Sequence, residues 1–548
     1  MIGPILLCGL CVCFYLLLLV RRWRYERLTS KIPTIPGDLP FIRHAHLLIG
    51  DSENLQKFIE DNSNKANKLG GIIKVWIGRR QHFLVTDPDV ALTLMNACLN
   101  KAYFYEFASS WIGQGIFTAK ADTWKAHRKL LNPTFSQHVL VGYLQVFNSR
   151  ARGLVSSLAA EVGRGEFDSF PYLAGYTLET ICNTVMGLPE DTRSSIIDQQ
   201  FVSAADTMLN LLIHRVQRVW YHWEWVYGWS AMKREEDRAA KVLKTASYDV
   251  LQKRKASKFN SPKDEIKNVG SRQQSFLDLL LDYNSSGLLS DQQVLEEVNT
   301  MIVAGYDTVA TALHFCLILL GSYPAVQEQV YEELQRVFGD SDRDVSKCDL
   351  GSLVHLEAVV KEAGRLLPAG AALARDVHHD VVFGLGSKFA PCGGRSDRDV
   401  SKCDLGSLVH LEAVVKEAGR LLPAGAALAR DVHQDVAFDN YTIPAGSSFV
   451  LSLWGLNRHP CWGADAHEFR PSRWLEPDGV PKHPAAYANF GVGRRSCIGK
   501  TYAIMAMKTT LAHLLRRYRV TSDHTRLRLK CDLLTKHVAG HHISLELR

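Results

Sequence analysis

Charged residues are absent from positions 1–20, which are almost entirely apolar, and five basic residues then follow before position 32 against a single Glu. An apolar run of about 20 residues is long enough to cross a bilayer. A basic flank of this kind stays on the cytosolic side. The pattern therefore predicts a transmembrane signal anchor over 1–20 and a basic, proline-rich segment over 21–40, in which Pro33, Pro36 and Pro40 exclude a helix. A cleaved signal peptide is the alternative, but its basic segment normally precedes the apolar run.

Further along the chain, the alternation of apolar and polar residues predicts separate elements. Residues 72–88 have the pattern of a β-hairpin, and residues 441–444 and 448–451 that of strands. Residues 253–274 are polar and charged, which indicates a solvated loop. Ser290 and Asp291 can cap a long helix that ends near Leu320. A further helical pattern runs over 500–519.

Composition adds limits to this picture. The chain has 548 residues with 46% hydrophobic residues, enough for a large core, and contains no long Gly/Ser or Pro linker. Its net charge of +7 is too small to indicate nucleic-acid binding, but suits an anionic membrane surface or an acidic protein partner. Its twelve cysteines are scattered, as is typical of reduced thiols in a cytosol-facing protein.

One of these cysteines carries the strongest chemical signal. Cys497 lies just before the helical pattern that begins at Lys500, where unpaired N–H groups and the helix dipole favour a thiolate. A thiolate can bind haem iron. Gly493 permits a tight bend, and Gly499 lets a flat macrocycle approach the backbone. A buried, inert cysteine before a helix is the alternative interpretation.

The residues around Cys497 match a known signature. Phe490, Gly493, Arg495, Cys497 and Gly499 occupy every fixed position of Phe-x-x-Gly-x-Arg-x-Cys-x-Gly, the haem-binding pattern of the cytochrome P-450 family. The chain resembles this family over nearly its whole length. Segments 111–117 and 177–187 resemble its family-4 branch, which includes fatty-acid ω-hydroxylases and many insect enzymes.

The resemblance implies a fold, a cofactor and an activity. The fold is mainly α with small β-sheets (α+β), and one haem-binding catalytic domain spans 41–548. Cys497 is the axial ligand of a haem b iron. The activity is that of a haem-thiolate monooxygenase, which hydroxylates a lipophilic substrate: RH + O₂ + NADPH + H⁺ gives ROH + H₂O + NADP⁺. The substrate is a fatty acid, hydrocarbon, hormone or xenobiotic.

The resemblance also implies which side chains hold the haem propionates. Trp124 and Arg128 lie four residues apart, on one face of a predicted helix. Arg495 and Arg430 complete the propionate set. Alone, the Trp–Arg pair is a common packing motif, and only the signature around Cys497 gives it this meaning.

The predicted long helix contains Ala304-Gly305-Tyr306-Asp307-Thr308, which the family places over the distal face of the haem. Cleavage of the O–O bond needs two protons, so the acid Asp307 and the alcohol Thr308 are the expected catalytic residues. We expect Gly305 to leave room for O₂ and substrate, and Tyr306 to narrow the distal channel. Ala304 replaces a Glu that often forms an ester with haem in family 4, which predicts non-covalent haem.

A 43-residue segment occurs twice. Residues 341–383 and 396–438 are nearly identical and lie 55 positions apart, so one unit fewer leaves 493 residues. Each copy carries the family's Glu-x-x-Arg pair, as Glu362 and Arg365 or as Glu417 and Arg420. Because the second copy leads into the strand pattern at 441, we expect it to dock, with Arg473 joining Glu417 and Arg420. A duplicated exon or faulty gene model explains the repeat.

No dinucleotide fingerprint occurs in the chain, so the resemblance implies a separate NADPH–cytochrome P-450 reductase, with cytochrome b5 as a second donor. Lys500, Lys508, Arg516, Arg517 and Arg519, with Lys125 and Lys129, are candidates for a basic docking face. The expected location is the endoplasmic reticulum membrane, with the catalytic domain facing the cytosol. Two alternatives stay open: a haem-thiolate enzyme that rearranges hydroperoxides, and an inactive product of the duplication.

Overall fold

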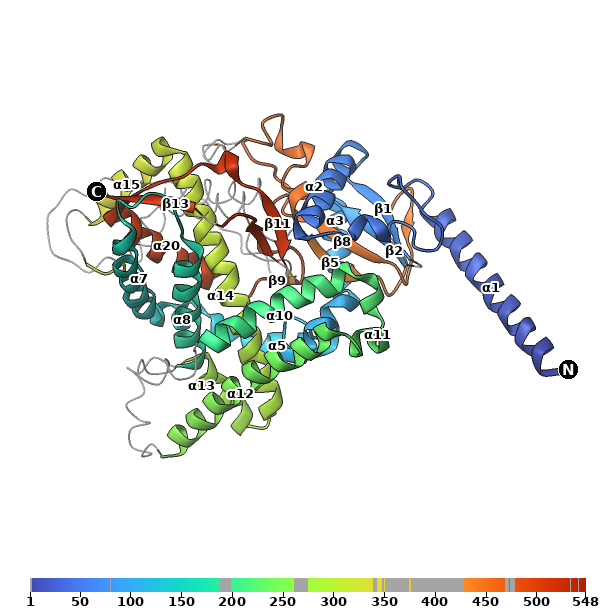
Figure 1. Ribbon diagram of the computed structural model, residues 1–548, viewed down its shortest axis with the longest axis horizontal. Helices are drawn as coiled ribbons and strands as arrows, with labels where there is room; N and C mark the ends of the chain where they lie inside the picture. The colour runs from blue at the N-terminus through green and yellow to red at the C-terminus, as the bar shows by residue number, and fades with distance from the viewer. Residues whose placement is uncertain are drawn as a thin grey trace, which may run out of the picture.

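The structure is a computed structural model that describes residues 2–78, 80–187, 199–260, 275–338, 343–346, 349, 374–375, 427–468, 473, 479–532, 534–540 and 542–548. Helices form most of it, with the sheet that contains β1 (Ile72–Ile77), β2 (Arg80–Val85), β8 (Ser448–Ser452) and β5 (Ala427–Asp431) at the right and strand β13 (His542–Leu547) at the left of Figure 1. The expected mainly α fold with small sheets is confirmed for these residues.

The longer helices are α1 (Ile2–Leu28), α2 (Ser52–Lys68), α3 (Pro88–Ala97), α5 (Ala121–Leu131), α7 (Leu144–Leu158), α8 (Phe170–Met186), α10 (Gln199–Gln217), α12 (Ala231–Asn260), α13 (Phe276–Ser285), α14 (Asp291–Ser322), α15 (Pro324–Phe338) and α20 (Lys500–Arg517). Shorter helical turns are η1 (Ala45–Leu48), η2 (Tyr103–Ala108), α4 (Ser109–Ile112), η3 (Asn132–Phe135), α6 (Gln137–Gly142), η4 (Ala159–Glu161), η5 (Val219–His222), α11 (Glu224–Gly228), α19 (Leu453–Leu456), η8 (Pro460–Trp462) and η10 (His524–Arg526).

The strands are β1 (Ile72–Ile77), β2 (Arg80–Val85), β3 (Phe167–Asp168), β4 (Ala374–Arg375), β5 (Ala427–Asp431), β6 (Val436–Ala437), β7 (Thr442–Ile443), β8 (Ser448–Ser452), β9 (Arg495–Ser496), β10 (Tyr518–Thr521), β11 (Leu529–Asp532), β12 (Leu534–His537) and β13 (His542–Leu547). The largest sheet has the order β1-β2-β8-β5, in which β2 and β8 are parallel and the other neighbours antiparallel. The predicted hairpin and both predicted strands are therefore confirmed.

Helix α14 runs through the middle of the helical part (Figure 1). Ser290 caps it, because its hydroxyl accepts the N–H of Gln293 while the Gln293 side chain accepts the N–H of Ser290. The helix packs along α8 and α20. By length and composition α14 could cross a membrane, but 78% of its most apolar 18-residue stretch is buried in the protein. We therefore interpret α14 as a core helix, close to the predicted span of Ser290 to Leu320.

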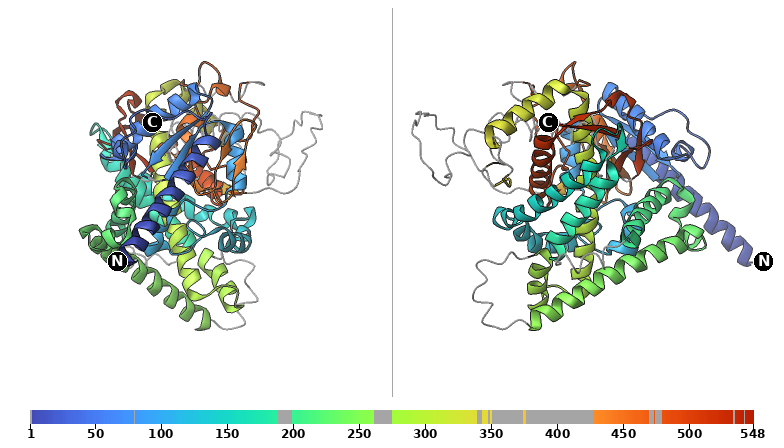
Figure 2. Two further views of the ribbon diagram at one scale, coloured as in Figure 1. Left: turned by 90° about the vertical axis from the view of Figure 1, so that its right-hand side faces the viewer. Right: turned by 60° about the vertical axis from the view of Figure 1, so that its left-hand side comes forward.

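Helix α1 projects from the body of the protein (Figure 1 and the right-hand view of Figure 2). It continues through the basic residues to Leu28, so position 20 is not a boundary of secondary structure. Its last turns contact the body, since the Tyr25 hydroxyl donates to the Ala445 carbonyl over 2.6 Å and Lys74 pairs with Glu26 at 2.9 Å. The proline-rich segment after it contains no helix up to η1, as expected.

The first part of the predicted loop at 253–274 is helical, and residues 261–274 lie outside the described residues. Helix α12 extends to Asn260, and the basic residues Arg254 and Lys255 belong to it. Arg254 pairs with Asp278 at 2.7 Å and Lys255 with Asp291 at 2.6 Å, which ties α12 to the starts of α13 and α14. Because Lys and Arg are good helix formers, a charge-rich sequence did not require a loop here.

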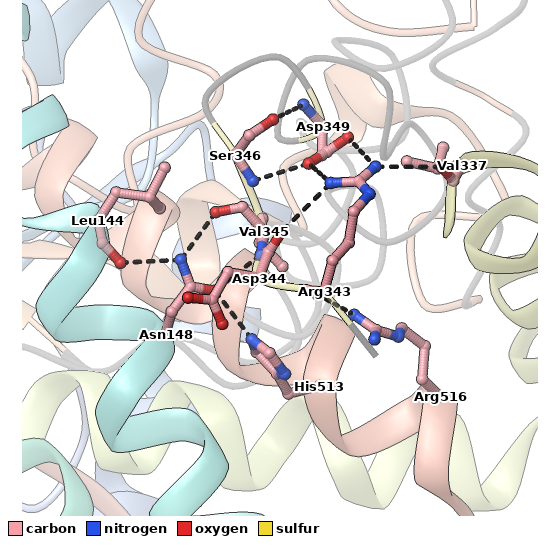
Figure 3. A network of polar contacts seen from close by, with 10 residues as sticks. All are labelled: Leu144, Asn148, Val337, Arg343, Asp344, Val345, Ser346, Asp349, His513 and Arg516. Atoms are coloured by element: carbon pink, nitrogen blue, oxygen red, sulfur yellow. Dashed lines mark hydrogen bonds and ion pairs between the residues drawn. The ribbon is translucent and has the colours of Figure 1, made fainter. Parts of the chain in front are cut away.

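The described parts of the repeat are the start of the first copy, the two residues of β4 (Ala374–Arg375) later in that copy, and the end of the second copy. The start of the first copy lies against α7 and α20, where the Asn148 side chain bonds both the N–H and the carbonyl of Val345, at 2.8 and 2.7 Å (Figure 3). Arg343 pairs with Asp349 at 2.5 Å in the same network. The end of the second copy forms β5 in the largest sheet, and the two residues of β4 in the first copy pair with β9. Glu362, Arg365, Glu417 and Arg420 lie outside the described residues.

Candidate functional site

The loop before α20 forms a tight turn around Cys497. Gly493 has φ +71°, which favours glycine, and a Cβ there would lie 2.7 Å from Asn96 Oδ1. The Cys497 N–H donates to the Phe490 carbonyl over 2.9 Å, which closes the loop. Gly499 is the N-cap of α20, and a Cβ there would stand 3.8 Å from Cys497 Sγ. The loop therefore presents Cys497 just before the first turn of α20.

The electrostatics of Cys497 differ from the expectation. Burial raises the pKa of its thiol to about 11, although a hydrogen bond from the Gly499 N–H and the charges of Arg128 and Lys500 act in the opposite direction. The desolvation of a buried thiolate outweighs the helix N-terminus. Ionisation at neutral pH therefore requires a further positive charge beside the sulfur, such as a metal ion.

One cavity brings the cysteine loop and α14 together. Cys497, Gly499 and Phe490 lie in its wall, and α14 contributes Asp307 and Thr308 among other residues. The remaining wall is mostly apolar and aromatic, with Phe107, Trp111, Ile116, Phe117, Ile181, Val185, Met208, Leu209, Val303, Val309 and Ala312. On α14, Val303 and Val309 line the cavity, whereas Ile302 is buried elsewhere. The two halves of the predicted site thus face a single apolar space.

The acid–alcohol pair has defined partners. Lys536 of β12 lies 3.2 Å from Asp307 Oδ1, and the carboxylate is buried. Burial raises the pKa of Asp307, and Asp206 and Asp532 add to this rise, whereas Lys536 opposes it. The Thr308 hydroxyl donates to the Ala304 carbonyl over 2.6 Å. Asp307 can therefore hold a proton beside the cavity, and the Thr308 oxygen stays available as an acceptor.

One expectation for this segment is wrong, and the other stays a prediction. Gly305 lies in the cavity wall, and a Cβ there would lie 2.5 Å from Ile181 Cδ1 of α8, so the missing side chain also lets α8 approach. Tyr306 does not narrow the cavity, because its buried side chain is not part of the wall and its hydroxyl donates to Asp206 of α10 over 2.6 Å. Both residues serve helix packing around α14.

Buried cations gather between the cysteine loop and η2. Arg495 donates to the carbonyls of Leu99 and Ala119 over 2.9 and 2.8 Å, and its guanidinium lies 4.9 Å from the centre of the Trp124 ring. Arg128 on α5 donates to the Ser496 carbonyl over 3.0 Å. The structure thus brings Trp124, Arg128 and Arg495 together, as the sequence predicted.

Arg430 of β5 is fully buried beside this group, and its backbone pairs with Lys101. Neither Arg430 Nε and Nη2 nor Lys101 Nζ has a hydrogen-bond partner among the described residues. Burial lowers the pKa of Lys101, and the charges of Arg430 and Arg495 lower it further. A buried cluster of positive groups without an acid is costly unless an anion joins it. Sequence reasoning missed Lys101, because a single Lys in an aromatic segment carries no local signal.

A sequence profile described as Cytochrome P450 matches residues 33–389 and 394–540 of this chain. The chain belongs to the cytochrome P450 family. Cytochrome P450 4c21 of Blattella germanica is 29% identical to it, over 96% of this chain and 95% of that relative. The human Cytochrome P450 4V2 is 28% identical, over 96% and 91%, and Cytochrome P450 4c3 of Drosophila melanogaster is 27% identical, over 92% and 87%. These relatives confirm the family-4 branch, and the chain is a monooxygenase oxidoreductase.

The residues of this P450 fit the haem that its family implies. A haem carries two propionate carboxylates, and the unpartnered nitrogens of Arg430 and Lys101 are the donors that such anions need. Cys497 places a sulfur at the cavity wall, where an iron ion would supply the positive charge that stabilises its thiolate. The orphaned donors and the sulfur therefore belong to one binding site.

The expectation for one basic side chain of the P450, Arg473, stays a prediction, and that for another, Lys508, is wrong. Arg473 is buried and pairs with Asp465 at 2.8 Å, while its predicted link to Glu417 and Arg420 involves residues outside the described ranges. Lys508 is buried within α20 and cannot belong to an exposed docking face. Lys125, Lys129, Lys500, Arg517 and Arg519 are exposed.

Proposed function

We propose that this P450 hydroxylates a lipophilic substrate with dioxygen and with electrons from a separate NADPH–cytochrome P450 reductase. The observation that carries the proposal is the single apolar cavity that joins Cys497 to Asp307 and Thr308. Haem b, held by Cys497, supplies the redox chemistry that activates dioxygen. Because Ala304 brings no carboxylate to the cavity wall, we propose that the haem is non-covalent.

The protein side chains have separate tasks in this proposal. Cys497 would hold the haem iron through its sulfur, and Arg430, Lys101, Arg495, Arg128 and Trp124 would hold the propionates. Asp307 delivers protons, which it exchanges through the Lys536 contact, and Thr308 receives them at its hydroxyl. The apolar wall orients the substrate and excludes bulk water. Its composition supports fatty acids, hydrocarbons, hormones or xenobiotics as substrates.

Exposed basic residues support an acidic electron donor. Lys500 and Arg517 lie on α20, which follows the cysteine loop, and Lys125 and Lys129 lie on α5, which Arg128 ties to that loop. Such a surface attracts an acidic flavoprotein domain over long range. We propose the same surface for cytochrome b5.

The proposed location is the endoplasmic reticulum membrane, with α1 as the anchor and the catalytic domain in the cytosol. Four tryptophans near α11 support a second membrane contact, since Trp is favoured at membrane–water interfaces. Trp220, Trp223, Trp225 and Trp229 are 40, 61, 74 and 89% exposed. Exposure of this size has no explanation in the packing of the protein itself.

The repeat favours a second candidate, an inactive chain that never loads haem. A hydroperoxide-rearranging enzyme is less well supported, because it has little need for Asp307 and Thr308. The test is the absorption spectrum of the membrane-expressed chain after reduction by dithionite and addition of carbon monoxide. A strongly red-shifted Soret band that is lost in Cys497→Ser supports thiolate-bound haem. NADPH consumption that requires added reductase then separates the monooxygenase from the rearranging enzyme.

A further inference from the structure

A buried pair outside the cavity connects three parts of the site. His127 of α5 and Glu297 of α14 are both buried, and His127 Nδ1 lies 2.6 Å from Glu297 Oε1. The other carboxylate oxygen, Oε2, accepts the N–H of Ile116 over 3.1 Å. Neither residue lines the cavity, and the proposed reaction does not use them.

The cap of α14 sets the proton position on His127. Gln293 Oε1 accepts the Ser290 N–H over 2.9 Å, so the amide nitrogen of Gln293 faces His127 Nε2 at 3.2 Å. An amide nitrogen can only donate, which makes Nε2 the acceptor and leaves the proton on Nδ1. His127 therefore donates to Glu297 through Nδ1–H.

The peptide of Ile116 is held from both sides. Its N–H donates to Glu297, and its carbonyl accepts from Arg495 Nη2 over 3.3 Å. Arg495 belongs to the cysteine loop and Glu297 to α14. Ile116 thus ties the two halves of the site together through its backbone, while its side chain lies in the cavity wall.

The segment around Ile116 also lies unusually close to α14. A Cβ on Gly113 would stand 2.2 Å from Glu296 Oε1, and a Cβ on Gly115 would stand 2.1 Å from Thr300 Oγ1. Only glycine permits this approach. Trp111, Ile112, Ile116 and Phe117 of the same segment line the cavity. The two glycines bring residues 111–117 onto α14, and the polar pair fixes them there.

We propose that His127 and Glu297 are positioning residues, which fix the 111–117 wall segment and thereby determine which molecules fit beside the haem. This inference extends the proposed function, since it assumes that the cavity accepts a ligand. The pair does not touch the reacting atoms. It acts through the Ile116 peptide.

Hydrogen exchange of the full-length, membrane-expressed protein tests the proposal without any need for activity. In Glu297→Leu, the amides of residues 111–119 should exchange at least about tenfold faster, because a buried hydrogen bond to a charged group is lost. The β1–β2 hairpin should not change. Ser247→Ala is the control, since it removes another buried hydrogen bond to α14, from Ser247 to Asn299. Unchanged exchange at 111–119 in Glu297→Leu would overturn the proposal.

Two variants of His127 provide a matched comparison, which can be made even if Glu297→Leu does not fold. Asn mimics Nδ1 of histidine and Gln mimics Nε2. His127→Asn should therefore retain the slow exchange of 111–119, whereas His127→Gln should lose it. Equal behaviour of the two variants, or the reverse order, contradicts the assigned proton position and the proposal with it.

Azole titrations of the haem-loaded protein report on the wall itself. Imidazole needs only the iron, whereas clotrimazole is bulky enough to touch residues 111–117. In His127→Gln, the Kd of clotrimazole should change about tenfold while that of imidazole stays the same. A parallel change in both would indicate general damage and would count against a positioning role. If the protein does not bind haem, no variant gives an azole spectrum. The hydrogen-exchange experiment still tests the positioning role of His127 and Glu297 in that case.

Discussion

At the scale of single residues, the burial of the cationic side chains Lys101 and Arg430 needs an explanation. Both are buried, and neither Lys101 Nζ nor Arg430 Nε and Nη2 has a hydrogen-bond partner among the described residues. Arg495, by contrast, donates to backbone carbonyls. An unpaired buried charge costs several kcal/mol, so these two groups destabilise the chain until an anion reaches them. The haem site is thus prepared at the expense of the stability of the haem-free protein.

Lys101→Met should therefore have opposite effects in the two states. The free energy of unfolding of the haem-free chain should rise by about 1–3 kcal/mol, because a buried charge is removed. Haem should dissociate faster. Urea unfolding and transfer of haem to apomyoglobin measure the two effects, with exposed Lys129→Met as the control. A haem-free variant less stable than the parent contradicts this account.

The lowered pKa of Lys101 predicts that the stability of the haem-free protein depends on pH. The pKa of Lys101 is lower in the folded chain than in the unfolded chain. Between these two values the unfolded chain binds more protons, so the stability of the haem-free protein rises with pH there. The rise should shrink in Lys101→Met. Urea midpoints across the alkaline range measure it, and an unchanged slope would show that Lys101 is not the group responsible.

Asp307→Asn should slow turnover and stabilise the fold. We expect a loss of about 10²-fold in reductase-supported turnover, a typical size for removal of a proton donor, with the carbon monoxide spectrum intact. Because burial raises the pKa of Asp307, the folded state disfavours its charged form. The variant should therefore gain stability at neutral pH, and the gain should vanish as pH falls through the unfolded pKa of about 3.9. Thermal melts at several pH values measure it, with Asp237→Asn on the exposed face of α12 as the control.

At the scale of elements, the contact between α8 and α14 depends on a missing side chain. Gly305 lies against Ile181, and the two helices pack closely along their length. The same approach positions Asp307 and Thr308 two and three residues later. The helix pair therefore determines where the acid–alcohol pair faces the cavity.

Gly305→Ala should destabilise the protein by about 1–3 kcal/mol through overpacking, despite the better helix propensity of Ala. A smaller residue at Ile181 should relieve the clash. The double variant with Ile181→Ala should then be more stable than the sum of the two single effects predicts. Chemical denaturation of the four proteins measures the coupling, and strict additivity would show that the helices adjust without strain.

Local sequence signals were sufficient for several elements and insufficient for others. The Ser290 cap, the hairpin at 72–88 and the loop before Cys497 follow from short patterns of neighbouring residues. The roles of Gly305 and Tyr306 depend on Ile181 and Asp206, which lie more than 90 positions away. The His127–Glu297 pair likewise could not be predicted from the sequence, because the two residues lie far apart along the chain. Long-range partners, not local propensity, decide what such residues do.

At the scale of the whole molecule, the two repeat copies make contacts with different parts of the protein. The start of the first copy packs against α7 and α20, and the end of the second supplies β5 and Arg430. A chain with one unit would contain the same residues at both places. All the described contacts except the pairing of β4 with β9 therefore need one repeat unit and not two.

Equivalent residues in the two copies should thus respond differently to mutation. Arg343→Ala should lower stability by about 1 kcal/mol through its contact with Asp349, whereas Arg398→Ala should have no effect. At the other end, Arg430→Leu should weaken haem retention and Arg375→Leu should not. Thermal melts and haem transfer measure these pairs. Equal effects within a pair would show that the copies are interchangeable.

Deletion of residues 350–404 should leave a functional fold. It joins Asp349 to Leu405, the same Asp-Leu step that each copy carries. It keeps the described contacts with α7, α20 and the largest sheet and removes only the short pairing of β4 with β9. We expect at least as much red-shifted carbon monoxide signal per molecule as in the full chain, with less aggregation in size-exclusion chromatography. A deletion variant that no longer binds haem would mean that the surplus unit supports the site.

The near-identity of the two copies has a consequence for the inheritance of the gene. Because the two copies are nearly identical in amino-acid sequence, unequal crossing-over between them can excise one unit in frame, and of the observed contacts only the β4–β9 pairing is lost. Alleles of two lengths can then persist in one population and interconvert. Selection would act on the surplus unit only through its effect on yield, so the longer allele is a reversible lesion and not a permanent one.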